Sequence, residues 1–239
     1  MTHALITRPL AEANNTAQLV LALGFTPIID PLLTIEYRQE AAQELATLLH
    51  QRLQCIIVTS INGAKALARM TTKRNMLIIA VGVSTADTAQ AEGFDNIRTG
   101  CGHVAGLMDE IKEICQPQGG TILYVSADAI TLDMTKALTL QGFHTARIIA
   151  YHAIPSTELS AATAQLLTEQ NQAIALFYSK RTADIFMQLS QAYDLSSMAA
   201  FALSEEIADR LRIRPWRGIY NPTIATQEAL LSLVKDYAH

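Results

Sequence analysis

Six times along this chain, a short apolar run ends in a serine or threonine and is followed by a segment with helical spacing. Such runs are typical of strands buried on both faces, as in a parallel sheet covered by helices on either side. The hydroxyl can accept a hydrogen bond from a backbone N–H at the start of the next helix, as an N-cap. These six hydroxyls belong to Thr7, Ser60, Ser84, Ser126, Ser179 and Ser204. The pattern predicts an α/β fold with parallel sheets.

The same junctions predict where a ligand would bind. In parallel α/β sheets, ligands bind at the carboxyl ends of the strands, beside the amino ends of the helices. Backbone N–H groups and the helix dipole at that edge favour anions. The pattern therefore indicates an anionic ligand as well as a fold.

The order of elements indicates an internal duplication. A strand, a helix, Gly-Phe and a second strand occur around Gly24 and again around Gly142. Residues 55–150 contain four strand–helix units, whereas residues 173–239 contain three. The missing fourth unit matches residues 1–30, so the second domain is expected to be completed by the N-terminus.

We therefore expect two similar flavodoxin-like domains joined by a two-stranded β linker. One domain combines residues 1–33 with 156–239 and is discontinuous, and the other spans 40–149. The linker strands are expected at 34–39 and 150–155, and the hydroxyls of the two domains would line two walls of one cleft. Gly24 falls where a helix C-cap requires a left-handed residue, and a third Gly-Phe pair, Gly93-Phe94, closes the helix expected to begin near Ser84.

Composition limits the possible partners. Half of the residues are hydrophobic, 17% are charged and the net charge is −4, which favours a packed core and argues against a nucleic-acid partner. No apolar stretch approaches the ~20 residues that span a bilayer, so no membrane partner is expected. The cysteines Cys55, Cys101 and Cys115 are odd in number and lack CxxC spacing, which favours buried thiols in a reducing, cytoplasmic compartment.

Common motifs for metal binding, nucleophilic catalysis and nucleotide binding are missing from the sequence. The six histidines are scattered, and there is no HExxH, GxSxG, GxxxxGK[ST] or GxGxxG pattern. We expect no metal site.

The candidate binding residues lie at the strand–helix junctions, where hydroxyls, small residues and cations meet exposed backbone N–H groups. They are Thr7, Arg8, Pro9, Thr59, Ser60, Asn62, Gly63, Ala64, Gly82, Ser84, Ser126, Ser179 and Lys180. The alternative interpretation is simpler: helix caps, a proline in a first turn and solvated basic side chains. Tyr151 lies in the expected linker, where it either faces a cleft as a hydrogen-bond donor or packs on the linker.

Several short motifs follow one another in a characteristic order and spacing: Thr7-Arg8-Pro9, Leu23-Gly24-Phe25 with Pro31, Thr59 to Ala64, Val81 to Ala86, Ile122 to Ser126, Gly142 with Tyr151, Phe177-Tyr178-Ser179 and Asn221-Pro222-Thr223. Together they resemble the uroporphyrinogen-III synthase family over nearly the whole chain. The family's fold, two α/β domains with a two-stranded linker, agrees with the one expected here.

The resemblance implies a cofactor-free enzyme, a cyclising hydro-lyase of haem and sirohaem (porphyrin) biosynthesis. Its substrate would be hydroxymethylbilane, a linear tetrapyrrole with eight carboxylates, which cyclises with inversion of the terminal ring and loss of water. Tyr151 matches the family's linker tyrosine, a catalytic candidate that would assist departure of the hydroxyl. Thr85 matches the family's threonine after the Val-Gly strand, a further candidate for substrate binding, and Thr7-Arg8 and Ser60 to Ala64 match substrate-facing positions. A monomer that takes its substrate from hydroxymethylbilane synthase is the implied arrangement.

The chain also departs from the family pattern. Ser204-Glu205-Glu206-Ile207 stands where the family often has Gly-Pro-Thr-Thr, and Ser126-Ala127-Asp128 lacks the usual basic character. These departures leave open a catalytically weak or inactive two-lobed binding or regulatory protein for an anionic metabolite. A third alternative, another α/β enzyme such as a sugar-phosphate enzyme, is disfavoured by the lack of phosphate-loop glycines.

Overall fold

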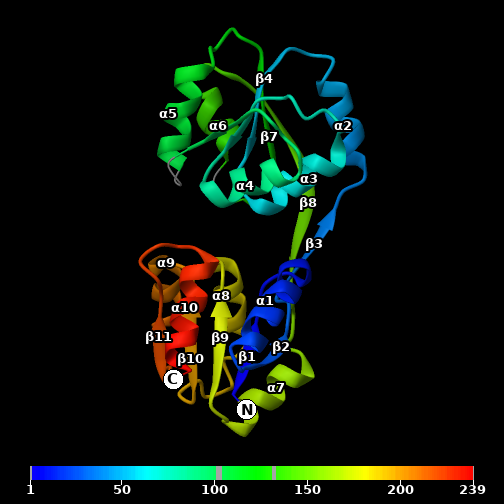
Figure 1. Ribbon diagram of the computed structural model, residues 1–239. Helices are drawn as coiled ribbons and strands as arrows, with labels where there is room; N and C mark the ends of the chain where they lie inside the picture. Colours follow the sequence, from blue (N-terminus) through cyan, green and yellow to red (C-terminus); the bar gives the residue numbers. More distant parts are fainter. Residues whose placement is uncertain (1, 101–103, 131–132, 239) are drawn as a thin grey trace. The chain divides into compact units, whose positions relative to one another are not determined.

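The computed structural model describes residues 2–100, 104–130 and 133–238. The chain forms two compact units, which Figure 1 labels by element. One, the discontinuous unit, consists of Met1–Thr34 and Ile154–His239, and the other, the continuous unit, is Ile35–Ala153.

In the discontinuous unit, five parallel strands form a sheet in the order β11-β10-β9-β1-β2. The strands are β1 (His3–Ile6), β2 (Thr26–Ile29), β9 (Ala173–Phe177), β10 (Met198–Ala202) and β11 (Gly218–Tyr220). The helices are α1 (Leu10–Ala22), α7 (Ala161–Glu169), α8 (Lys180–Leu189), α9 (Glu205–Leu211) and α10 (Gln227–Tyr237).

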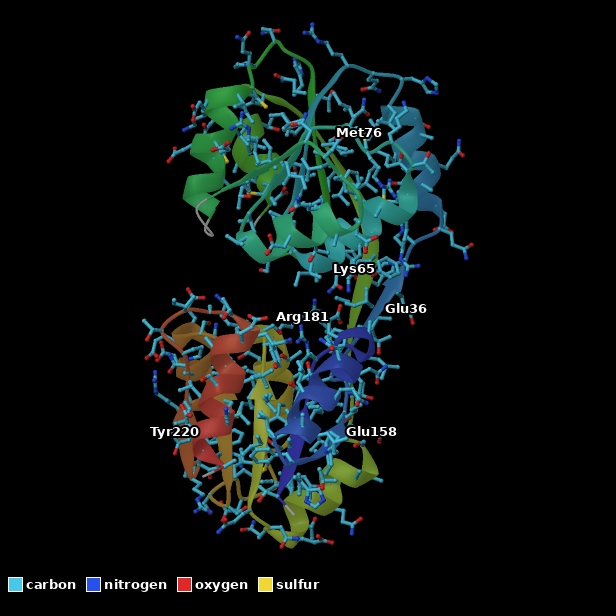
Figure 2. All side chains as sticks on the ribbon, in the orientation of Figure 1. Glu36, Lys65, Met76, Glu158, Arg181 and Tyr220 are labelled. Carbon is cyan, nitrogen blue, oxygen red and sulfur yellow. The ribbon has the colours of Figure 1, made fainter. Side chains whose placement is uncertain are left out.

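Helices α1 and α10 share one apolar cluster with this sheet. Ala13, Ala17 and Val20 of α1 pack with Leu230 and Val234 of α10 and with the buried strand residues. Aromatic rings extend the cluster, since Phe201 lies 5.1 Å from Tyr220 and 5.4 Å from Tyr237, centroid to centroid. Tyr220 lies at the end of β11 (Figure 2).

The continuous unit has a sheet in the order β3-β8-β7-β4-β5-β6, in which β4 to β8 pair in parallel. Its strands are β4 (Leu53–Val58), β5 (Ile78–Ala80), β6 (Ile97–Thr99), β7 (Thr121–Ala127) and β8 (His144–Pro155). Its helices are α2 (Glu40–Leu48), α3 (Ile61–Met70), α4 (Val83–Ala91), α5 (Val104–Ile114) and α6 (Met134–Thr139). Figure 1 shows α5 and α6 together on one side of the sheet and α2 on the other.

The two sheets have the same topology after a circular permutation. Strands β4, β5, β6, β7 and β8 occupy the positions that β9, β10, β11, β1 and β2 occupy in the other sheet. The predicted pair of similar flavodoxin-like domains, one of them discontinuous, is therefore confirmed. Strand β3 (Leu33–Tyr37) pairs with β8, which confirms the two-stranded linker.

The predicted Gly-Phe turns are also confirmed. Gly24, Gly93 and Gly142 have φ values of 87°, 93° and 86°, so each reverses the chain in the left-handed region after a helix. Phe25, Phe94 and Phe143 then enter the core. A side chain at φ near +90° would be strained, which explains the repeated use of glycine.

Three of the six predicted caps are wrong. Helix α1 begins at Leu10 with Pro9 as N-cap, because the residue before a proline is held extended and Thr7 therefore lies too early. Helix α4 begins at Val83 after Gly82, which places Ser84 inside its first turn. Ser126 lies within β7, which continues to Ala127, and Asp133 caps α6 instead.

The other three hydroxyls do occupy N-cap positions. Ser60 accepts a hydrogen bond from the N–H of Gly63, and Ser179 from that of Thr182. Ser204 precedes α9 but makes no side-chain capping bond. Cys101, which the sequence groups with the buried thiols, lies outside the described residues, whereas Cys55 and Cys115 are free and buried.

Candidate functional site

The carboxyl edge of the continuous unit's sheet brings two tyrosines against two hydroxyl side chains. Tyr151 Oη lies 2.8 Å from Ser60 Oγ, and Tyr124 Oη lies 3.1 Å from Thr59 Oγ1. Thr59 and Ser60 follow β4, while Tyr124 and Tyr151 come from β7 and β8. The strand order β8-β7-β4 explains why these four side chains lie close together, because the three strands are neighbours in the sheet.

Packing holds the ring of Tyr151 in place. The side chain is only 6% exposed, and its ring centroid lies 6.4 Å from that of Tyr37 in β3. The guanidinium carbon of Arg69, on α3, lies 4.3 Å from the centroid of Tyr37. Such cation–π stacking favours a fixed orientation of both groups. Neither Tyr37 nor Arg69 is signalled by any motif in the sequence.

Helix α3 starts with small residues that allow close approach. Gly63 and Ala64 are buried, whereas Asn62 and Ser60 are partly exposed. A Cβ on Gly63 would lie 3.3 Å from Ser60 Oγ and 3.4 Å from the carbonyl oxygen of Val125. Glycine at this position therefore leaves room for the Ser60 hydroxyl.

Helix α4, unlike α3, begins without a side-chain cap. Its N-cap is Gly82, which has no side chain with which to cap the helix. Ser84 is exposed in the first turn. Thr85 is buried, at 5% exposure. The first N–H groups of a helix have no acceptor within it, so an anion can bind there.

An arginine supplies basic character at the Ser126 junction, where the sequence lacks it locally. Arg147 Nε, from β8, donates to Ser126 Oγ at 2.8 Å, and its Nη2 donates to the carbonyl oxygens of Ala127 and Asp128 at 2.6 and 2.9 Å. Ser126 in turn donates to the Ala127 carbonyl. The hydroxyl of Ser126 is thus occupied, and Arg147 is the group here that sequence reasoning missed.

In the discontinuous unit, Thr7 and Arg8 make internal contacts. Thr7 is buried and its hydroxyl donates to the carbonyl of Leu176 at 3.0 Å. Arg8 Nη1 donates to Gln227 Oε1 at 2.6 Å and to Thr16 Oγ1 at 3.2 Å. Pro9, the third residue of the Thr7-Arg8-Pro9 motif, has no polar side-chain group and makes no such bond.

Arg8 also stacks on Tyr178, the residue that directly follows β9. Its guanidinium carbon lies 4.0 Å from the centroid of the Tyr178 ring. Burial raises the pKa of the Tyr178 phenol above its ordinary value, and the positive charge of Arg8 opposes part of that shift. The phenol is therefore neutral at physiological pH.

Lys180 follows the capping residue Ser179, and its ammonium group lies 2.8 Å from a carboxylate oxygen of Glu206. The hydrogen bond from Lys180 lowers the pKa of the Glu206 carboxyl. Glu205 is engaged as well, because Arg212 Nη1 lies 2.7 Å from Glu205 Oε1, so both glutamates of this segment pair with basic side chains.

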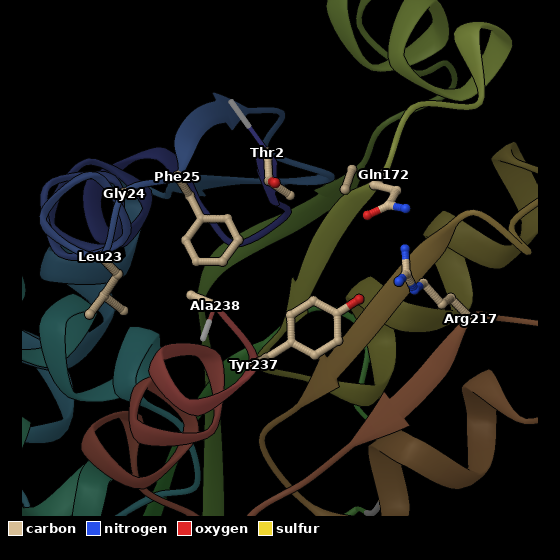
Figure 3. A pocket seen from close by; sticks show the side chains of 9 residues that line it. Thr2, Leu23, Gly24, Phe25, Gln172, Arg217, Tyr237 and Ala238 are labelled. Atoms are coloured by element: carbon tan, nitrogen blue, oxygen red, sulfur yellow. The ribbon is translucent and has the colours of Figure 1, made fainter.

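A separate cavity of about 470 Å³ lies in the discontinuous unit (Figure 3). Thr2, Phe25, Ala173 and Arg217 line it, and all four stand at the amino ends of strands or just before them. Ligands of parallel α/β sheets bind at the opposite, carboxyl ends. The hydroxyl residues described above do not line this cavity.

Between residues 2 and 238, apart from 101–103 and 131–132, no three His, Cys, Asp or Glu side chains gather as a metal site. Within the same described ranges, none of the helices has the length and apolar character required to cross a bilayer.

Fold and site together define a protein of two permuted flavodoxin-like units with hydroxyl and tyrosine side chains at the carboxyl edges of their sheets. A family model described as "Uroporphyrinogen-III synthase HemD" matches residues 14–232. The chain belongs to the uroporphyrinogen-III synthase family. The family resemblance seen in the sequence is thereby confirmed.

Solved structures agree in fold. The chain is similar to a uroporphyrinogen-III synthetase from Helicobacter pylori, with 17% identity, a TM-score of 0.63 and coverage of 99% of this chain and 100% of that one. It is also similar to a mutant uroporphyrinogen III synthase from Thermus thermophilus, with 16% identity, a TM-score of 0.62 and coverage of 99% and 97%. Comparison with the sequences of curated proteins finds no match.

Proposed function

We propose that this protein is a cyclising hydro-lyase that converts hydroxymethylbilane into uroporphyrinogen III, with inversion of the terminal ring and loss of water. Membership of the uroporphyrinogen-III synthase family supports this activity. The observation that carries the proposal is the Tyr151 hydroxyl, held 2.8 Å from Ser60 at the carboxyl edge of the sheet. A phenol in this place can act as a proton donor.

In the proposed first step, Tyr151 protonates the departing hydroxyl of the substrate. The C–O bond breaks, its electron pair goes to oxygen, and water leaves with the Tyr151 proton. A cationic pyrrole-methylene and a phenolate remain. The substituted α carbon of the terminal pyrrole, which has no hydrogen to lose, attacks this cation, and a spiro intermediate forms. The bond from that carbon to its original methylene bridge then breaks, which leaves a second pyrrole-methylene cation. The free α carbon of the inverted ring attacks this cation, and the proton that it loses returns to the phenolate. General acid catalysis of this kind contributes typically ~10²–10⁴-fold in rate.

The carboxylates of the substrate are proposed to bind at helix starts and cationic side chains. In the continuous unit, the open first turn of α4 after Gly82 and the small residues from Asn62 to Ala64 supply N–H donors. Arg147 adds a positive charge beside Ser126. In the discontinuous unit, Ser179 and Lys180 at the start of α8 are the corresponding candidates.

The internal contacts of Thr7 and Arg8 change what these residues are proposed to do. Both side chains are engaged within their own unit. We propose that they shape the loop before α1, so that its backbone rather than the Thr7 hydroxyl faces the substrate. Positioning a flexible chain in one reactive geometry can itself remove a large part of a barrier.

We further propose a cytoplasmic monomer that receives its substrate from hydroxymethylbilane synthase. The free, buried thiols of Cys55 and Cys115 support a reducing compartment. Hand-over is supported by the chemistry of the substrate, which closes to the type I isomer when no catalyst controls it.

The test is an isomer analysis. The protein is incubated with freshly prepared hydroxymethylbilane, the products are oxidised, and the type I and type III uroporphyrins are separated. We expect the type III isomer to predominate and to increase with protein concentration. Formation of the type I isomer alone would contradict the proposed function.

A further inference from the structure

The hydroxyl of Ser60 serves two groups at once. Its oxygen accepts a hydrogen bond from the N–H of Gly63 at 3.0 Å and lies 2.8 Å from Tyr151 Oη. A serine hydroxyl has one hydrogen to donate and two lone pairs to accept with. The Gly63 bond uses one lone pair, so the hydrogen of Ser60 is available for the oxygen of Tyr151.

This hydrogen decides the direction in which the phenol donates. When Ser60 donates to Tyr151, the phenol's own hydrogen points elsewhere and can be transferred. When Tyr151 donates to Ser60 instead, its hydrogen is occupied. Rotation of two hydroxyl hydrogens converts one arrangement into the other without moving a heavy atom.

The same contact stabilises the phenolate that proton transfer leaves behind. Hydrogen bonds to a charged oxygen are roughly twice as strong as those between neutral groups. Ser60 is also the N-cap of α3, a helix of 10 residues, whose amino end carries partial positive charge. Negative charge on Tyr151 is therefore one hydrogen bond away from a helix N-terminus.

The ring of Tyr151 needs no further positioning from Ser60. Its burial and the neighbouring ring of Tyr37 hold it. The contact with Ser60 therefore bears on the direction of the hydroxyl hydrogen and not on the place of the ring.

We propose that Ser60 is a positioning residue that directs the Tyr151 hydroxyl toward the departing group and stabilises the resulting phenolate. The proposal rests on the proposed function. It gives Ser60 a role in proton transfer that is distinct from binding a substrate carboxylate.

The experiment is a double-mutant cycle on turnover. Ser60→Ala should lower kcat by about 10–100-fold, as expected for loss of a hydrogen bond to a charged group, with KM changed by less than about threefold. In the Tyr151→Phe background, the same Ser60→Ala substitution should leave kcat unchanged, because there is no hydroxyl left to direct. Ser60→Thr keeps the hydroxyl and should retain most of the activity.

Loss of a helix cap needs its own control. Ser160 caps α7 in the other unit by the same bond, accepting from the N–H of Thr163 at 3.2 Å. Ser160→Ala should destabilise the protein about as much as Ser60→Ala while kcat stays at the wild-type value.

Three outcomes would overturn the positioning role: a Ser60→Ala variant with wild-type kcat, an equal fall in kcat in the wild-type and the Tyr151→Phe backgrounds, or a rise in KM alone. Each of these presupposes a wild-type protein that makes the type III isomer. A wild-type protein without that product contradicts the proposed function itself.

Discussion

The guanidinium of Arg8 lies over the ring of Tyr178, with its central carbon 4.0 Å from the ring centroid. The two residues come from the segments after β1 and β9, which are neighbouring strands. Gln227, at the start of α10, accepts a hydrogen bond from the same guanidinium. Arg8 therefore joins three chain segments that are distant in sequence.

Arg8→Met is expected to destabilise the discontinuous unit by about 1–3 kcal/mol, because it removes the stack and leaves the Gln227 oxygen without its donor. Urea unfolding measures the change. Arg217→Met, at an exposed arginine of the same unit, should stay within about 0.5 kcal/mol of wild type. Equal effects of the two substitutions would contradict a structural role for Arg8.

Tyr151→Phe is expected to lower kcat by about 10²-fold or more, since the variant has no proton to give. The ring and its packing are kept, so the free energy of unfolding should fall only by about 0.5–1.5 kcal/mol, the worth of one hydrogen bond. Steady-state kinetics and urea unfolding of the same preparation separate the two effects. An unaltered kcat would exclude Tyr151 from the proton transfer.

Gly63→Ala tests the Ser60–Tyr151 contact without removing either hydroxyl. The new Cβ would lie 3.3 Å from Ser60 Oγ, so the hydroxyl must shift by a few tenths of an ångström. Alanine is favoured over glycine in a helix by about 1 kcal/mol, which offsets the crowding. We expect lower kcat at nearly unchanged stability, and a kcat equal to that of wild type would show that the contact tolerates the shift.

The lowered pKa of the Asp128 carboxyl predicts a contribution to the stability of the folded protein that is lost in acid. The hydrogen bond from His152, at 2.9 Å, and the N–H of Ala129 hold the pKa of the Asp128 carboxyl below its usual range. A lowered folded-state pKa means that the contribution is present above the unfolded value of about 3.9 and is lost as the pH falls through the folded value.

Asp128→Asn should therefore unfold with less pH dependence below about pH 4 than the wild-type protein. Because both side chains are partly exposed, the difference is small and is best seen in an NMR titration of the Asp128 carboxyl. A titration midpoint at or above the ordinary value would contradict the expected pKa shift.

Sequence patterns were sufficient for the architecture. Apolar runs of strand length, helical spacing and the Gly-Phe turns at Gly24, Gly93 and Gly142 are local features, and each is decided within one strand or helix. Their order revealed the permuted duplication that the two sheets share. The caps at Ser60 and Ser179 were predictable for the same reason.

Local patterns failed where a neighbouring proline or an extended strand moved a helix start. Pro9 delayed α1, and the continuation of β7 through Ser126 delayed α6. In both cases a hydroxyl that looked like a cap became a buried group bonded to another part of the chain, such as Thr7 to Leu176.

The strands, the helices and the caps at Ser60 and Ser179 were thus determined by the sequence itself, since hydrophobic periodicity and capping act over a few residues. The partners of those hydroxyls were decided only by the tertiary structure. Ser60 meets Tyr151 across 91 residues, and Arg8 meets Gln227 across 219. Strand order and register bring such residues together, and both depend on how strands distant in the chain pair and bury their faces.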